Sequence, residues 1–127
     1  HNSYNKDNET NYLNFHHAEL NKELLDYYKG LVELRKKFPA FRKAWYEDVH
    51  FIEIKDKHFA LGYNIKYNNT EFLVLMNAEN KSEVRFDLPP GEWNIFVNPE
   101  KAGTSSIGKV LKTIMLQPKD GYVLIKN

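Results

Sequence analysis

A change of hydrophobic period near Pro39 constrains the fold of this chain more than any other feature. Between residues 17 and 38, apolar side chains recur at steps of three and four, which is the spacing of an amphipathic helix. From about residue 49 the period becomes two, as a half-buried strand requires. The clearest alternating set is Phe59, Leu61, Tyr63, Ile65 and Tyr67. One helix followed by an all-β region is therefore predicted.

The expected helix has a broad apolar stripe and a basic last turn. Three cations in that turn complement the helix dipole, and Pro39 then ends the helix. Gly30 lies mid-helix at a cost of about 1 kcal/mol relative to alanine. A small residue there indicates that another segment packs closely against it. The stripe comprises Leu20, Leu24, Tyr27, Leu31, Leu34 and Phe38, widened by Tyr28 and Val32.

The remainder of the chain reads as short strands separated by turns. We expect about seven strands at intervals of roughly ten residues, with no helix between them. The motif PPG at 89–91 is expected to break the chain between two of them. This spacing predicts an antiparallel β-sandwich with Greek-key-like connections, preceded by the one amphipathic helix. The expected strands cover 49–55, 59–67, 71–78, 83–88, 92–98, 110–117 and 121–127.

The amino-acid composition excludes several classes of function and of site. Lysine and arginine number 18 against 17 aspartates and glutamates, which gives no electrostatic argument for nucleic acid or an anionic membrane. The absence of cysteine excludes disulfides, thiolate metal sites and a cysteine nucleophile. No apolar run approaches the ~18 residues that a membrane span needs. The sequence does not begin with methionine, which suggests a piece of a longer chain, and both a bacterial cytoplasmic and a secreted or cell-surface location stay open.

Few residues have the spacing that catalysis or metal binding needs. Asp7 and Glu9 are two apart in a loop, and nothing positions them for acid–base work. The adjacent His16 and His17 diverge by about 100° on a helix, and no third ligand is evident. The segment GTSSIGK at 103–109 lacks the residue order and the following helix of a phosphate loop. We therefore expect no catalytic residue, metal site or cofactor in this chain.

Aromatic residues offer one candidate binding feature. Trp45 and Trp93, together with Tyr46 and Tyr67, could form a platform on which sugar rings stack. Aromatic residues in a small sandwich are more often core, and Trp93 in a strand after a tight turn fits that alternative. The residues alone thus describe a helix-plus-sandwich module without an assembled active site.

Several segments resemble glycoside hydrolase family 13, in particular type I pullulanases and related debranching enzymes. NSYN at 2–5 and DNE at 7–9 resemble the loop after the last barrel strand. The run LLDYYKGLVELRKKFPAFR at 24–42 resembles the last barrel helix and its exit. PPGEWNIFVNPEKAG at 89–103 resembles the carboxy-terminal domain. The resemblance therefore spans most of the chain.

This resemblance implies a division at residue 42. Residues 1–42 would be the last loop and helix of a (β/α)8 catalytic barrel, and residues 43–127 a C-terminal all-β domain that packs on that barrel. The parent enzyme would hydrolyse α-1,6 linkages of α-glucans with an aspartate and a glutamate carried upstream, so this chain alone would be inactive. The loop residues Asn2, Tyr4, Asn5 and Asp7 would be candidates for substrate contact in the parent.

Two other functions stay open on the sequence. The chain could be a carbohydrate-binding module that holds α-glucans without cleaving them, or an unrelated protein-interaction domain whose helix binds a partner. In the barrel interpretation, the stripe of Leu20, Leu24, Tyr27 and Leu31 is divided between the sandwich and the barrel. The isolated chain would then expose part of the helix and could self-associate through it.

Overall fold

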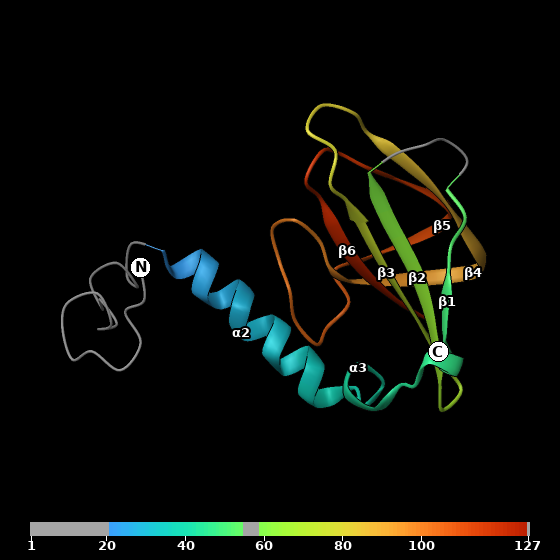
Figure 1. Ribbon diagram of the computed structural model, residues 1–127. Coiled ribbons are helices and arrows are strands. Elements are labelled where there is room, and N and C mark those ends of the chain that lie inside the picture. Colours follow the sequence, from blue (N-terminus) through green and yellow to red (C-terminus); the bar gives the residue numbers. More distant parts are fainter. Residues whose placement is uncertain (1–20, 55–58, 127) are drawn as a thin grey trace, which may run out of the picture.

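The computed structural model describes residues 21–54 and 59–126 (Figure 1). Its helical part is N-terminal and its strands follow, so the predicted fold class, mainly antiparallel β behind one amphipathic helix, is confirmed. The elements are α2 (Lys22–Lys37), α3 (Ala40–Lys43), the 3-10 helix η1 (Tyr46–Asp48), β1 (Val49–Phe51), β2 (Ala60–Tyr67), β3 (Thr70–Asn77), β4 (Val84–Val97), β5 (Gly108–Leu116) and β6 (Gly121–Lys126).

The six strands of the described residues belong to one antiparallel sheet in the order β1-β2-β3-β6-β4-β5. The insertion of β6 between β3 and β4 makes the order non-sequential, as a Greek-key-like connection requires. Six strands replace the expected seven because the segments 83–88 and 92–98 form a single strand, β4. The expected break at PPG was therefore wrong.

The PPG motif bends β4 rather than ending it. The pairing of β4 with β5 shifts register between Asp87 and Glu92, and Gly91 has a φ of 117°. Prolines lack the N–H that a ladder needs, so they are tolerated at such an irregularity, where residues are unpaired. The bend lets the first half of β4 fold back over the sheet from which it came.

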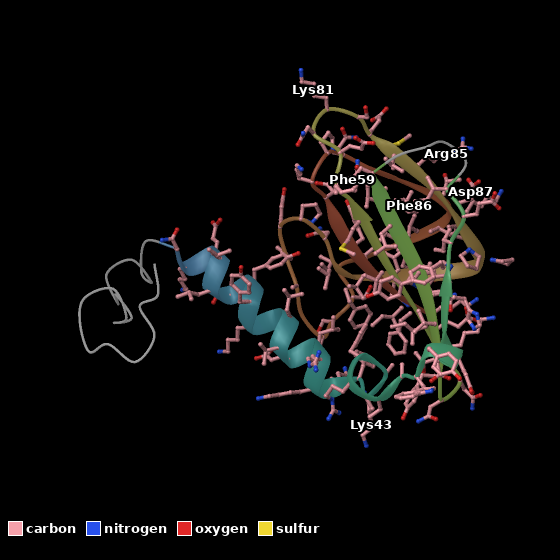
Figure 2. All side chains as sticks on the ribbon, viewed as in Figure 1. Lys43, Phe59, Lys81, Arg85, Phe86 and Asp87 are labelled. Atoms are coloured by element: carbon pink, nitrogen blue, oxygen red, sulfur yellow. The ribbon has the colours of Figure 1, made fainter. Side chains whose placement is uncertain are left out.

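This folding back creates an inner core between two layers of the same sheet. Phe86 of β4 lies so close to β2 that a Cβ at Gly62 would be 2.9 Å from its Cε1. In Figure 2, Phe86 points inward while Arg85 and Asp87 point outward. The sandwich is therefore built from one bent sheet. Its buried inner core consists of Leu73, Leu75, Val84, Phe86, Trp93, Leu116 and Leu124.

The helices cover part of the outer face of the sheet. Leu34 of α2 and Ala40 of α3 are buried against β2, β3, β4 and β6. The rings of Phe38 and Phe41 meet Phe72 edge to face, with centroids 5.4 and 5.0 Å away. The buried residues of this outer core are Leu34, Ala40, Ile65, Phe72, Val97 and Ile125. Within residues 21–54 and 59–126, no helix has the length and apolarity to cross a membrane.

Candidate functional site

The helix α2 meets the sandwich along one side only. Tyr27, Leu31 and Leu34 pack on the outer core, and Gly30 between them is buried. At 100° per residue these four positions fall within about 100° of the helix circumference. This side of α2 therefore packs on the β domain.

Gly30 lets the loop between β4 and β5 approach the helix backbone (Figure 1). A Cβ at Gly30 would lie 1.9 Å from the carbonyl oxygen of Ala102, so any larger residue would meet backbone. The same loop accepts a hydrogen bond of 2.8 Å from the Tyr27 hydroxyl at the Asn98 carbonyl. Burial raises the pKa of Tyr27, which keeps this hydroxyl a donor at neutral pH. The close approach that the sequence predicts at Gly30 is confirmed.

The adjoining side of α2 is apolar and uncovered. Its residues are Leu24, Leu25, Tyr28 and Val32, exposed by 53%, 45%, 59% and 52% respectively. They also fall within about 100° of arc, next to the sandwich-facing side. An amphipathic helix in a complete domain hides its apolar stripe, so this uncovered α2 face has the character of an interaction surface.

Several expected site residues lie outside the described part of the chain. They include the proposed substrate contacts Asn2, Tyr4, Asn5 and Asp7. Their roles stay predictions. The same holds for Glu9, His16, His17 and Leu20.

Trp93 is a core residue and not a sugar platform. Its side chain has 0% exposure, and its indole N–H donates to the Pro89 carbonyl oxygen at 2.9 Å. The Lys126 ammonium lies 4.9 Å from the ring centroid. No ring face is left for a ligand, so the stacking role expected for Trp93 is replaced by packing.

Trp45 and Tyr46 are open to solvent, at 66% and 74% exposure. Their ring centroids are 5.7 Å apart, but the planes meet at 51°, so the pair is tilted rather than flat. Tyr67 is half-buried and packs on the outer core, away from any platform. A sugar-stacking role for Trp45 stays a prediction.

Within the described residues, the serine-rich loop at 103–109 is not a phosphate loop, and no metal-binding group is found. Gly108 begins β5 rather than a helix, and Ser106 donates to the Gly108 carbonyl oxygen at 3.0 Å. Among residues 21–54 and 59–126, no three histidine, aspartate or glutamate side chains form a group that could hold a metal ion.

A polar pair that the sequence analysis did not single out lies on the inner face of the sheet. Asn64 of β2 is 5% exposed and donates to the Glu71 carboxylate of β3 at 3.2 Å. Asn64 stands at a position of the alternating pattern where a polar, solvent-facing residue is expected, so the sequence carried no signal that it would be buried. Nothing in the sequence indicated which face of the strand would be enclosed.

Solved structures with similar folds come from carbohydrate-active enzymes. No protein-family model matches the chain. Pullulanase from Bacillus acidopullulyticus superposes with a TM-score of 0.78 and 22% identity, over 89% of this chain and 15% of that one. A substituted trehalulose synthase gives a TM-score of 0.64 and 16% identity, over 90% of this chain and 20% of that one.

The trehalulose synthase from Pseudomonas mesoacidophila gives a TM-score of 0.59 and 18% identity, over 83% of this chain and 19% of that one. These TM-scores show a shared fold. The chain spans from 15% to 20% of the length of the chains in these three structures.

Proposed function

We propose that this chain is the C-terminal part of a pullulanase-like α-glucan debranching hydrolase of glycoside hydrolase family 13. The observation that carries the proposal is the division of α2 into a sandwich-facing side and an uncovered apolar side. A helix shared between two domains needs two apolar sides. The fold shared with pullulanase and the family-like segments of the sequence point to a catalytic barrel as the second domain.

In this proposal the β domain has a structural role. It covers one side of the last barrel helix, and the uncovered α2 face packs on the barrel. Removal of the barrel would leave Leu24, Leu25, Tyr28 and Val32 exposed, and through them the isolated chain would self-associate. The loop residues Asn2, Tyr4, Asn5 and Asp7 would then line the substrate cleft on the C-terminal face of the barrel.

The chain alone is proposed to be inactive. Retaining glycoside hydrolysis needs a nucleophilic carboxylate and an acid–base carboxyl about 5–5.5 Å apart. The family carries this pair on upstream strands, which have no counterpart here. Release of reducing ends from pullulan by this chain would overturn the claim.

The encoding gene provides the decisive test. We expect several hundred codons upstream that specify barrel strands and both acidic motifs, and a full-length product that hydrolyses pullulan. In that product, Val32→Asp should lower the melting temperature and the activity, because a charge would be buried at the domain interface. Lys29→Asp on the polar side of α2 is the matched control and should change neither. A gene without barrel codons would sink the proposal and favour an unrelated interaction domain.

A carbohydrate-binding module is the second candidate, and the exposed ring of Trp45 favours it. Titration of this chain with maltooligosaccharides discriminates between the two. Millimolar or tighter binding that is lost in Trp45→Ala would support the module. If the titration shows no binding at Trp45 and Tyr46, the result favours the structural role of the β domain.

A further inference from the structure

The outer face of the sheet stays apolar beyond the part that the helices cover. The cross-strand pair Ile65–Phe72 is buried under α2 and α3. Further along the same face, the pair Leu61–Met76 is 40% and 41% exposed. Phe59, next in the alternation, is 74% exposed and lies at the end of β2 that is far from α3 (Figure 2). The alternating pattern of the sequence therefore continues onto a sheet face that the described residues leave exposed.

This exposed part of the face surrounds a shallow hollow of about 240 Å³. The hollow is smaller than the roughly 300–1,000 Å³ of small-molecule sites, and no lining side chain carries a charge or a hydrogen-bonding group. It therefore fits an apolar side chain rather than a polar ligand. Phenylalanine and methionine are enriched in the cores of protein interfaces. The lining residues, here called the outer sheet patch, are Phe59, Ala60, Leu61, Met76 and Ala78.

A groove of about 770 Å³ lies between the first turns of α2 and the sheet. On the helix side it is lined by Leu24, which belongs to the uncovered α2 face, and by Tyr27. On the sheet side it is lined by Gly121 of β6, which pairs with Met76 of the outer sheet patch. The two uncovered apolar surfaces therefore border one groove.

The charged residues of the groove do not select a polyanion. Glu23 and Glu100 stand against Lys101 and Lys119, so the lining gives no net attraction for nucleic acid or an anionic membrane. Apolar surface bordered by balanced charges is the composition of a protein–protein interface, with an apolar core and a polar rim. The groove and the outer sheet patch thus fit another protein surface.

The position of α2 favours an attached domain over a second copy of this chain. The helix begins at Lys22, and its first turn, with Glu23 and Leu24, lines the groove. In the proposed function the barrel directly precedes α2, so it is tethered at the groove. A short tether gives an effective concentration in the millimolar range, which a second copy at about micromolar concentration does not match.

We propose that the catalytic barrel covers the outer sheet patch as well as the uncovered α2 face, and fills the groove between them. A large apolar side chain of the barrel enters the hollow between Phe59, Leu61 and Met76. This assignment rests on the proposed function. It adds a second contact surface, on the sheet, to the helix surface that the proposed function already uses.

The two methionines of the chain provide a matched pair of probes. Met76 lies in the outer sheet patch, and Met115 lies on β5 opposite Arg85, on the outside of the other layer. They are 41% and 43% exposed, so hydrogen peroxide should oxidise both at similar rates in this chain at low micromolar concentration. In the full-length product, Met76 should react at least about fivefold more slowly and Met115 at an unchanged rate. Mass spectrometry of the digested protein measures both rates.

A substitution at each methionine gives an independent readout. Met76→Lys should leave the melting temperature of this chain unchanged, because the side chain is half-exposed there, and lower that of the full-length product, because a charge would be buried. Met115→Lys should change neither.

Three outcomes would overturn the assignment. Equal oxidation of the two methionines in a full-length product that hydrolyses pullulan would remove the sheet contact and leave the proposed function standing. Protection of Met76 in this chain alone that grows with concentration would assign the patch to a second copy. A gene without barrel codons would remove both the proposed function and this contact.

Discussion

At Gly30 the helix α2 and the loop between β4 and β5 approach each other closely. Gly30→Ala gains about 1 kcal/mol of helix propensity, but its methyl group would lie 1.9 Å from the Ala102 carbonyl oxygen. Relief requires the β4–β5 loop to move, and overpacking of this kind typically costs 1–3 kcal/mol or more. A contact of 1.9 Å places the cost at the upper end of that range, so we expect a net loss of about 2 kcal/mol in the free energy of unfolding by urea.

Gly103→Ala is the control for that experiment, since it lies in the same loop and a Cβ there has no heavy atom within 4 Å. It should change stability by less than about 0.5 kcal/mol. Equal effects of the two variants would contradict the close packing of the loop on α2.

Glu71 links stability to pH. Its pKa is lower in the folded chain than its usual 4.5, so its contribution to stability is fully present above that value and is lost as pH falls through the folded pKa. Glu71→Gln should therefore be destabilising at neutral pH, and this effect should be lost as the pH falls through the lowered pKa of the folded chain. Urea unfolding of both proteins at a series of pH values measures the difference. A gap that widens in acid would contradict the assigned direction.

Single residues also show what sequence reasoning could and could not reach. The small residue at position 30 indicated a close approach, because a helix interior selects against glycine. The role of Trp93 could not be predicted from the sequence. An indole ring is equally suited to a hydrophobic core and to a sugar-stacking platform, and only its neighbours in the fold decide between them. Asn64 and Glu71 are 7 residues apart in sequence but adjacent across a hairpin, so their pairing depends on the register of β2 and β3.

The strand β4 shows how local signals can mislead about an element. Two prolines and a glycine are strong breakers, yet Gly91 only turns the strand while the ladder resumes at Glu92. β4 pairs with β5 both before and after the PPG motif, and this pairing outweighs the tendency of proline and glycine to end a strand. For the helix α2, the sequence predicted the wide apolar stripe correctly. It did not indicate which half of that stripe would face the sandwich.

Gly91→Ala tests the bend. Its φ of 117° lies in a region that L-residues rarely adopt, and strain there amounts to about 1–3 kcal/mol. We expect a loss of that size in the free energy of unfolding. Gly108→Ala is the matched control: it lies on the neighbouring strand without a positive φ, and its nearest new contact would be Ile95 at 3.9 Å. A neutral Gly91→Ala would contradict the bend geometry.

The molecule as a whole depends on the helices for its outer core. The expected domain boundary after residue 42 cuts α3, and it separates Leu34 and Ala40 from the sheet residues that they cover. Phe72 and Ile125 are each 2% exposed only with this cover in place. Burying a large apolar side chain contributes about 1.5–3 kcal/mol, and a whole domain is stable by only about 5–15 kcal/mol.

A chain of residues 43–127 should therefore lose most of its stability and expose an apolar sheet face. We expect poor NMR dispersion, binding of a hydrophobic dye and no cooperative thermal transition. The control is Leu24→Lys with Val32→Lys in the full chain, which alters only the uncovered α2 face. It should keep the melting temperature and reduce self-association in sedimentation experiments. A shortened chain that unfolds cooperatively at the parent temperature would show that the sandwich stands alone, and that α2 and α3 belong with the barrel instead.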